Sequence, residues 1–265
     1  MAFEPFIIKL ILSFIVGGSW IAFTIWISER FGSKIGGILI GLPSTILVSL
    51  LFIAWTQSNS AAVSAVPVIP AATAVNSLFL VAFILLYRYG RSVAYLGAVL
   101  VWCLLVLPLV ALRLNNLAIS LVLAAFFFTL SLSFLRRFPH RKLPGAILTK
   151  KEILFRVIFG GGFVMLAVFF GKTLGPLWGG MFASFPAAFS SSLLILSHRH
   201  GFDFMTSVTK TMPYGNMGSI IFVIAFFFLV PLYGLALGVI AAYIASLIFA
   251  IFVYKRLSTK EIINL

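Results

Sequence analysis

The chain has 265 residues, of which 62% are apolar and only 9% are charged, and its formal net charge is +14. A soluble domain carries about 25% charged residues, so a water-soluble globule and a disordered chain are both excluded. The basic excess fits a membrane protein, in which lysine and arginine collect in cytoplasmic loops. No aromatic-basic module accompanies that excess, so we expect no nucleic-acid partner.

Apolar runs long enough to cross a bilayer recur along the whole chain. A helix needs about 20 apolar residues to span the hydrocarbon core. Nine such spans are predicted: Pro5–Ile27, Ile35–Trp55, Ala61–Tyr87, Val93–Leu112, Leu117–Leu135, Ile153–Phe170, Leu177–Ser197, Phe204–Leu232 and Gly234–Tyr254. The predicted fold class is therefore all-α, a polytopic helical membrane protein with about nine transmembrane helices.

The basic residues predict the orientation of these spans. Fourteen lie in alternate loops and the C-terminal tail: Arg30, Lys34, Arg88, Arg91, Arg136, Arg137, Arg141, Lys142, Lys150, Lys151, Arg199, Lys255, Arg256 and Lys260. The opposite loops hold Arg113 and Lys172. This bias predicts a cell membrane protein with its N-terminus outside and its C-terminus in the cytoplasm. Lys9 and Arg156 lie close to span ends, where long basic side chains snorkel to the interface.

An internal repeat appears when the sequence is shifted by 143 residues, which aligns 10–87 with 153–230 without a gap. Five glycine pairs coincide, where chance gives about 0.5. Five spans precede the second copy, so the two copies would cross the membrane in opposite directions. We expect a first repeat with extra spans (1–135), a basic cytoplasmic linker (136–152) and a second, inverted repeat (153–265). Inverted repeats are typical of secondary transporters, although dual-topology ancestry without transport is the alternative.

Prolines within the spans indicate discontinuous helices and a substrate site. A proline frees a backbone carbonyl, and lipid tolerates freed groups only where protein or water surrounds them. The predicted helix breaks are Pro43, Pro70, Pro186 and Pro213. The polar residues near them predict a substrate site formed by Ser44, Thr45, Thr73, Asn76, Ser190, Ser191, Thr209, Lys210, Thr211, Asn216 and Ser219. For the segments around Pro43 and Pro186, a packing seam with a proline kink is the alternative.

Lys210 is the single residue from which the charge of the substrate is inferred. An ammonium group inside a span costs about 2.5 kcal/mol or more and usually faces a cavity or a partner. One interpretation is a counter-charge for an anionic substrate. The other is a snorkelling lysine near the cytoplasmic interface that pairs with Asp203, seven residues earlier.

No motif for intramembrane chemistry is present: the sequence lacks H-E-x-x-H and G-x-S-x-G. We therefore expect no enzyme activity, no cofactor and no metal site. No acidic residue lies clearly at the midplane, so the coupling ion stays open. Whether the protein acts as a monomer or a homodimer is also open.

The stretch that begins Gly179-Gly-Met-Phe-Ala-Ser-Phe-Pro186 resembles the signature of the small GlpM-like membrane proteins, and Gly36–Leu51 is a looser copy of it. The resemblance implies a duplicated and fused form of such a unit. From the repeat, we expect a secondary transporter for a small polar, anionic solute in contact with the lipid bilayer. The alternatives are a translocase for lipid or polyprenyl phosphate, and a membrane scaffold subunit that transports nothing.

Overall fold

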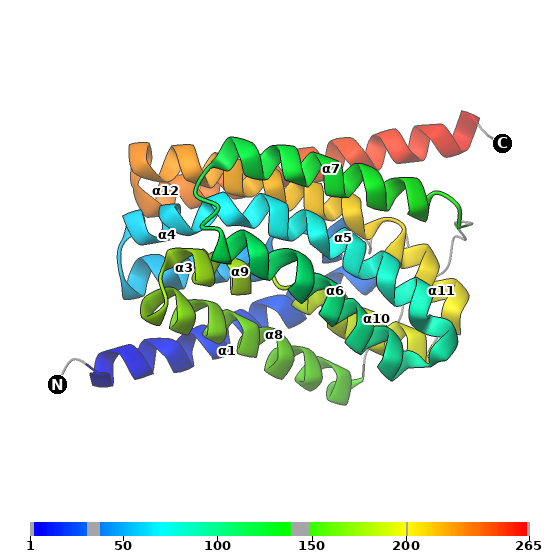
Figure 1. Cartoon of the computed structure of the whole chain (residues 1–265), viewed down its shortest axis with the longest axis horizontal. Coiled ribbons are helices and arrows are strands. Elements are labelled where there is room, and N and C mark those ends of the chain that lie inside the picture. The colour runs from blue at the N-terminus through cyan, green and yellow to red at the C-terminus, as the bar shows by residue number, and fades with distance from the viewer. Residues whose placement is uncertain (1–2, 31–37, 139–148, 200, 264–265) are drawn as a thin grey trace.

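The structure is a computed structural model that describes residues 3–30, 38–138, 149–199 and 201–263 (Figure 1). Within these ranges the regular elements are helical, as the composition predicts. In chain order they are α1 (Phe3–Arg30), α3 (Ser44–Thr56), α4 (Asn59–Ala65), η1 (Val66–Val68), α5 (Ile69–Leu86), η2 (Tyr87–Tyr89), α6 (Arg91–Ala111), α7 (Leu117–Leu135), α8 (Lys150–Thr173), α9 (Pro176–Ala183), α10 (Ala187–Arg199), α11 (Gly201–Thr209) and α12 (Met212–Ile263).

Eight helical segments of the described chain are long and apolar enough to cross a membrane. The last of them, Gly201–Arg256, has 56 residues and contains two helices that meet at Gly234, where φ is 77°. Figure 1 shows the chain reversing direction along α12, from orange to red. The predicted eighth and ninth spans are therefore the two parts of this one segment, and the fold is that of a multi-pass helical membrane protein.

The predicted linker 136–152 is shorter at its C-terminal end than hydropathy indicates. Helix α8 begins at Lys150 because Thr149 and Glu152 form a capping box: the Thr149 hydroxyl accepts from the Glu152 N–H, and the Glu152 carboxylate accepts from the Thr149 N–H at 2.7 Å. Charged residues hide this start from an apolar count. The central part of the predicted linker, residues 139–148, lies outside the described residues.

Helices α1 and α8 form an antiparallel pair. The Nζ of Lys172, near the end of α8, lies 3.8 Å from the ring centre of Phe6, near the start of α1. Midway along both helices, glycines bring the two backbones together, because a Cβ on Gly18 would lie only 2.3 Å from the Val157 carbonyl oxygen. Small residues at such a contact allow the close helix packing that drives association in lipid.

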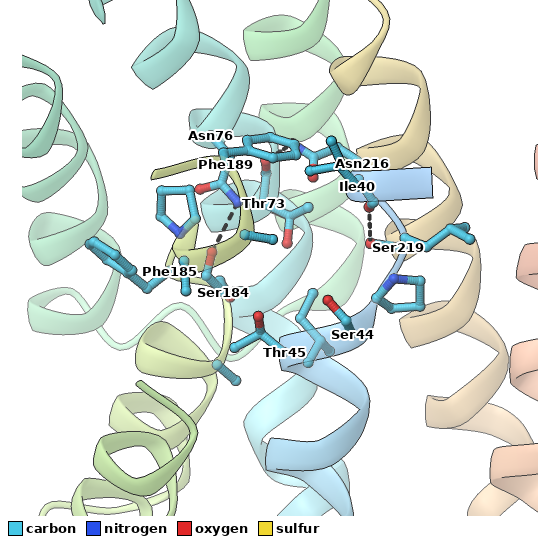
Figure 2. Close-up of a pocket in the computed structure, with 18 residues that line it drawn as sticks. Ile40, Ser44, Thr45, Thr73, Asn76, Ser184, Phe185, Phe189, Asn216 and Ser219 are labelled. Atoms are coloured by element: carbon cyan, nitrogen blue, oxygen red, sulfur yellow. Dashed lines mark hydrogen bonds between the residues drawn. The ribbon is translucent and has the colours of Figure 1, made fainter. Parts of the chain in front are cut away.

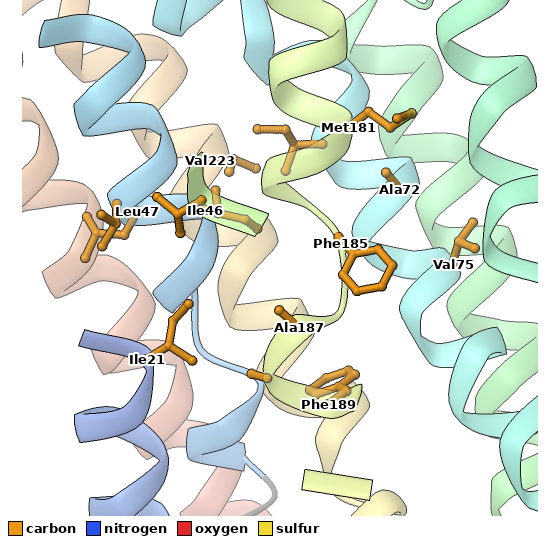
Figure 3. Close-up of a cluster of buried hydrophobic side chains, with 14 of the residues drawn as sticks. Ile21, Ile46, Leu47, Ala72, Val75, Met181, Phe185, Ala187, Phe189 and Val223 are labelled. Atoms are coloured by element: carbon orange, nitrogen blue, oxygen red, sulfur yellow. The ribbon is translucent and has the colours of Figure 1, made fainter. Parts of the chain in front are cut away.

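The segments with internal prolines form the centre of the bundle. Their most apolar windows are 83% buried for 38–56, 83% for 59–89 and 89% for 176–199, against 22–33% for the other five. Figure 3 shows side chains from these central segments meeting one another, among them Ile46, Val75 and Phe185. The remaining helices surround them and expose apolar side chains, as helices that face lipid do.

Near one end of the molecule, Arg156 departs from the prediction that it snorkels. Its side chain has no exposed surface, although it lies only one turn beyond the start of α8. One turn earlier, the Glu152 carboxylate forms an ion pair with Arg199 at the end of α10, with an N–O distance of 3.0 Å. The same carboxylate attracts Arg156, which lowers the cost of burying a positive charge there.

Candidate functional site

Two helices of the bundle centre are broken at equivalent points. Helix α9 ends at Ala183 and α10 begins at Ala187, with Pro186 between them. In the first half, residues 38–40 are helical and α3 begins at Ser44, just after Pro43. Each break therefore lies at one of the predicted proline positions, and the two positions are 143 residues apart.

The hydrogen bonds of the two breaks are alike. The Ser44 N–H donates to the Leu42 carbonyl at 2.7 Å, and the Ala187 N–H donates to the Phe185 carbonyl, also at 2.7 Å. These N–H groups would otherwise close the helical bonds to the residues four positions earlier, Ile40 and Ala183.

Each break also lacks the donor that a proline cannot supply. Within the described part of the chain, no hydrogen bond reaches the carbonyl oxygens of Ile40 and Ala183. Pro43 and Pro186 occupy the positions three residues later and carry no N–H.

The predicted breaks at Pro70 and Pro213 take a different form. Segment 59–89 continues through the short 3₁₀ turn Val66–Val68, whose flanking residues keep helical φ and ψ. Pro70 is the second residue of α5, in the first turn, where a missing N–H costs nothing. Pro213 likewise is the second residue of α12, and the interruption before it is a turn at Lys210 and Thr211. The expectation of an unwound stretch around Pro70 is therefore wrong.

A small cavity of about 30 Å³ lies between the two breaks. Both breaks line it, together with residues of α5 and α12 (Figure 2). The predicted site residues that line it are Pro43, Ser44, Thr45, Thr73, Asn76, Pro186, Asn216 and Ser219. The sequence therefore brought together six of the polar side chains that share this cavity.

Two side chains hold the breaks in place through backbone carbonyls. The Asn76 amide donates from Nδ2 to the Ser184 carbonyl at 2.9 Å, and the Ser219 hydroxyl donates to the Gly41 carbonyl at 2.8 Å. The two acceptors are 143 residues apart, and so are the two donors. Ser184 was missed by the sequence reasoning, and the signal that finds it is its equivalence to Gly41.

A third bond joins α12 to α5 at the middle of the cavity. The Asn216 amide donates from Nδ2 to the Thr73 carbonyl at 3.2 Å, and these two residues are themselves 143 apart. The Trp102 indole N–H donates to the Asn76 Oδ1 at 2.8 Å, which fixes the orientation of that amide. Thr73 is 1% exposed, and no hydrogen bond from its hydroxyl is found among the described residues. In Figure 2 the oxygens of Thr73, Ser44 and Thr45 face one another.

Five predicted substrate residues do not line this cavity: Ser190, Ser191, Thr209, Lys210 and Thr211. The Lys210 ammonium group donates to the Phe138 carbonyl, at the end of α7, at 2.7 Å. The Thr209 hydroxyl bonds back to the Met205 carbonyl of its own helix at 2.7 Å. The charge of a substrate in the cavity is therefore no longer inferred from Lys210.

A larger cavity of about 460 Å³ lies nearer one end of the same helices. Trp178 of α9 and Ser64 of α4 line it, with Arg113 and Asn115 from the loop between α6 and α7. No carboxylate is among its lining residues, or among those of the smaller cavity. Helix α9 runs from the larger cavity at Trp178 to the smaller one at Ala183, so the two are about one and a half helical turns apart.

Comparison with protein families gives one match, to "Protein of unknown function (DUF3147)", over residues 10–115 and again over 153–259. The chain belongs to this family. The two DUF3147 matches begin 143 residues apart, which is the shift that aligns the halves. The matches support a duplicated DUF3147 unit, whereas the finer resemblance to GlpM-like proteins stays a prediction. No curated protein and no solved structure matches the chain.

Proposed function

We propose that this DUF3147 protein is a secondary transporter built from two inverted repeats. The observation that carries the proposal is a set of reciprocal contacts. Asn76 bonds to Ser184 while Ser219 bonds to Gly41, so each half makes the same contact with the other. Reciprocal contacts of this kind are the signature of a two-fold axis.

The α1–α8 pair supports the same axis. A Cβ on Gly17 would lie 2.7 Å from the Val164 side chain, and a Cβ on Gly160 would lie 2.8 Å from the Ile21 side chain. Subtracting 143 from the second-half numbers turns one contact into the other. Since α1 and α8 are antiparallel, an axis that exchanges them lies across the helices, in the plane of a membrane. Two halves related in this way have two mirror-related arrangements of similar energy, which is the basis of alternating access.

The larger cavity supports a small anion as the solute. Its volume of about 460 Å³ suits a small molecule. Arg113 provides a positive charge at its lining, with no carboxylate to oppose it. Both loops around it, near Arg113 and Gly175, belong to the side that the positive-inside rule assigns to the exterior. We therefore place this cavity at the outer entrance of a protein with a cytoplasmic C-terminus.

Alternating access is tested by labelling a cysteine in the small cavity from each side of a liposome membrane. We expect Ser44→Cys, with Cys103 replaced by serine, to react with a membrane-impermeant thiol reagent from both sides. Ser246→Cys is the control, because Ser246 is fully buried away from both cavities and donates to the Gly218 carbonyl. Labelling of Ser44→Cys from neither side would support a scaffold, and flipping of fluorescent lipid in the same liposomes would support a lipid translocase.

A further inference from the structure

The small cavity has the size of an ion site rather than a solute site. A volume of about 30 Å³ is about two water-sized probe spheres, and one such sphere occupies roughly 10–15 Å³. A small anionic metabolite does not fit into it, whereas a dehydrated monatomic ion does. A second ligand, distinct from the solute, therefore suits this position.

The strong donors around the cavity are already used. Asn76, Asn216 and Ser219 each donate to a backbone carbonyl, at 2.9, 3.2 and 2.8 Å. These bonds leave an excess of oxygen acceptors at the cavity, and oxygen atoms are the ligands that hard cations prefer.

Three of the remaining oxygens have no hydrogen bond among the described residues. They are the carbonyls of Ile40 and Ala183, one from each break, and the hydroxyl of Thr73. Thr73 is 1% exposed and, in Figure 2, its oxygen points between the two breaks. A buried polar atom without a partner costs about 1–3 kcal/mol, so an ion that binds all three oxygens would offset that cost.

We propose that this cavity binds a dehydrated sodium ion, which is the coupling ion of the transporter. The inference rests on the proposed function. All of the oxygens are neutral, which favours a monovalent cation over a divalent one, since calcium sites recruit carboxylates. Carbonyls released where a membrane helix is unwound are the ligands that coordinate sodium in broken-helix transporters. Because the ligands come from both halves and from α5, bound sodium ties the halves together.

Thermal unfolding of the purified full-length protein in detergent tests sodium binding directly. Sodium chloride is compared with potassium chloride and choline chloride at constant chloride. We expect sodium to raise the unfolding temperature saturably, as a ligand of the native state does, with a smaller effect of potassium and none of choline. An equal effect of all three salts would overturn the proposal, because it would report ionic strength alone.

Thr73→Val removes the unpartnered hydroxyl and keeps the shape of the side chain. We expect it to raise the half-maximal sodium concentration by roughly tenfold, the equivalent of about 1.4 kcal/mol. The matched control is Ser77→Ala, which removes another buried hydroxyl without a found partner, one turn along α5 and outside the cavity; its sodium response should equal that of the wild type. Thr45→Val gives a second test within the cavity if Thr73→Val does not fold.

The first-turn N–H groups of α3 and α10 would instead favour an anion. Replacing chloride by gluconate at constant sodium separates the two ions, and a response that follows the anion would overturn the proposal. Sodium binding without labelling of Ser44→Cys from both sides would reject the transporter and keep the ion site. Labelling from both sides without a sodium response would do the reverse.

Discussion

The two helix breaks have the same hydrogen bonds but pack against their neighbours differently. At the first break a Cβ on Gly41 would lie 2.6 Å from the Met212 carbonyl oxygen, and one on Gly215 would lie 2.1 Å from the Ile38 carbonyl oxygen. At the second break the equivalent positions are Ser184 and Ala72, both of which carry side chains. The first break is therefore held by direct backbone packing, and the second has room for two Cβ atoms.

A similar contrast appears in the side chains that bond to the breaks. Ser219 makes one hydrogen bond, to Gly41, whereas Asn76 bonds to Ser184 and also accepts from Trp102. The geometry of the repeat is thus kept while the chemistry diverges, with close packing on one side and a larger polar network on the other. Two-fold halves need similar shapes, not identical side chains, to exchange places.

The largest expected effect is that of a methyl group added to the tightly packed break. Gly215→Ala should destabilise the protein by about 2–3 kcal/mol, because the neighbouring atoms are backbone and cannot move aside. Ala72→Gly, at the equivalent place in the first half, should cost about 1 kcal/mol, since it removes one buried methyl. Denaturation by sodium dodecyl sulfate from mild detergent, followed by circular dichroism, measures both.

Gly218→Ala is the control for this experiment. Its added Cβ would find its nearest neighbour, the Ser246 hydroxyl, at 3.3 Å, and that atom is the end of a short side chain. We expect a change within about 1 kcal/mol. If Gly215→Ala were as mild as Gly218→Ala, the first break would not be packed by backbone contact and the contrast between the halves would disappear.

The next effect compares the two side chains that bond to the breaks. Asn76→Ala should cost about 2 kcal/mol, because the Ser184 carbonyl and the Trp102 indole both lose their partner. Ser219→Ala should cost about 1 kcal/mol, since it removes one bond. The same unfolding assay applies, and tryptophan fluorescence gives an independent measure at Trp102. Equal costs for the two variants would contradict the larger polar network on the second break.

Asn76→Ser gives the first half the residue type that the second half has at the equivalent position. We expect a cost between those of Asn76→Ala and the wild type, because the shorter hydroxyl reaches fewer partners. A variant as stable as the wild type would show that the amide adds nothing beyond what Ser219 provides.

Composition, proline spacing and the 143-residue shift were enough to predict the helical fold and the breaks at Pro43 and Pro186. Those signals are local or compositional, so a single sequence carries them. The break expected at Pro70 was wrong because a proline in a first helical turn and a proline inside a helix look alike without the helix start. The position of Lys210 beside Phe138 was not predictable either, since its acceptor is a backbone carbonyl from a distant helix.

Backbone groups explain most of what the sequence left out of the site. Ser184 contributes its carbonyl to Asn76, and Ile40 and Ala183 contribute carbonyls without side-chain chemistry. A residue type says nothing of a carbonyl, so only the repeat, which maps Gly41 onto Ser184, points to them. Arg156 shows the converse, because a basic residue near a span end was assigned to the interface and is fully buried.

The smallest effect distinguishes the two halves where their first helices meet the ends of α3 and α10. Lys9 donates to the Trp55 carbonyl at 2.9 Å, and at the equivalent place Glu152 pairs with Arg199 at 3.0 Å. Lys9→Met and Glu152→Gln should each cost about 0.5–1 kcal/mol, and glutamine keeps the capping box of α8. The ion pair is partly exposed, so salt screens it, and raising sodium chloride from 0.05 to roughly 1 M should shrink the cost of Glu152→Gln while that of Lys9→Met stays constant. Whatever cost of Glu152→Gln persists in high salt measures its attraction for the buried Arg156. A Glu152→Gln cost unaffected by salt would mean that the exposed pair with Arg199 contributes nothing and that the two junctions differ in Arg156 alone.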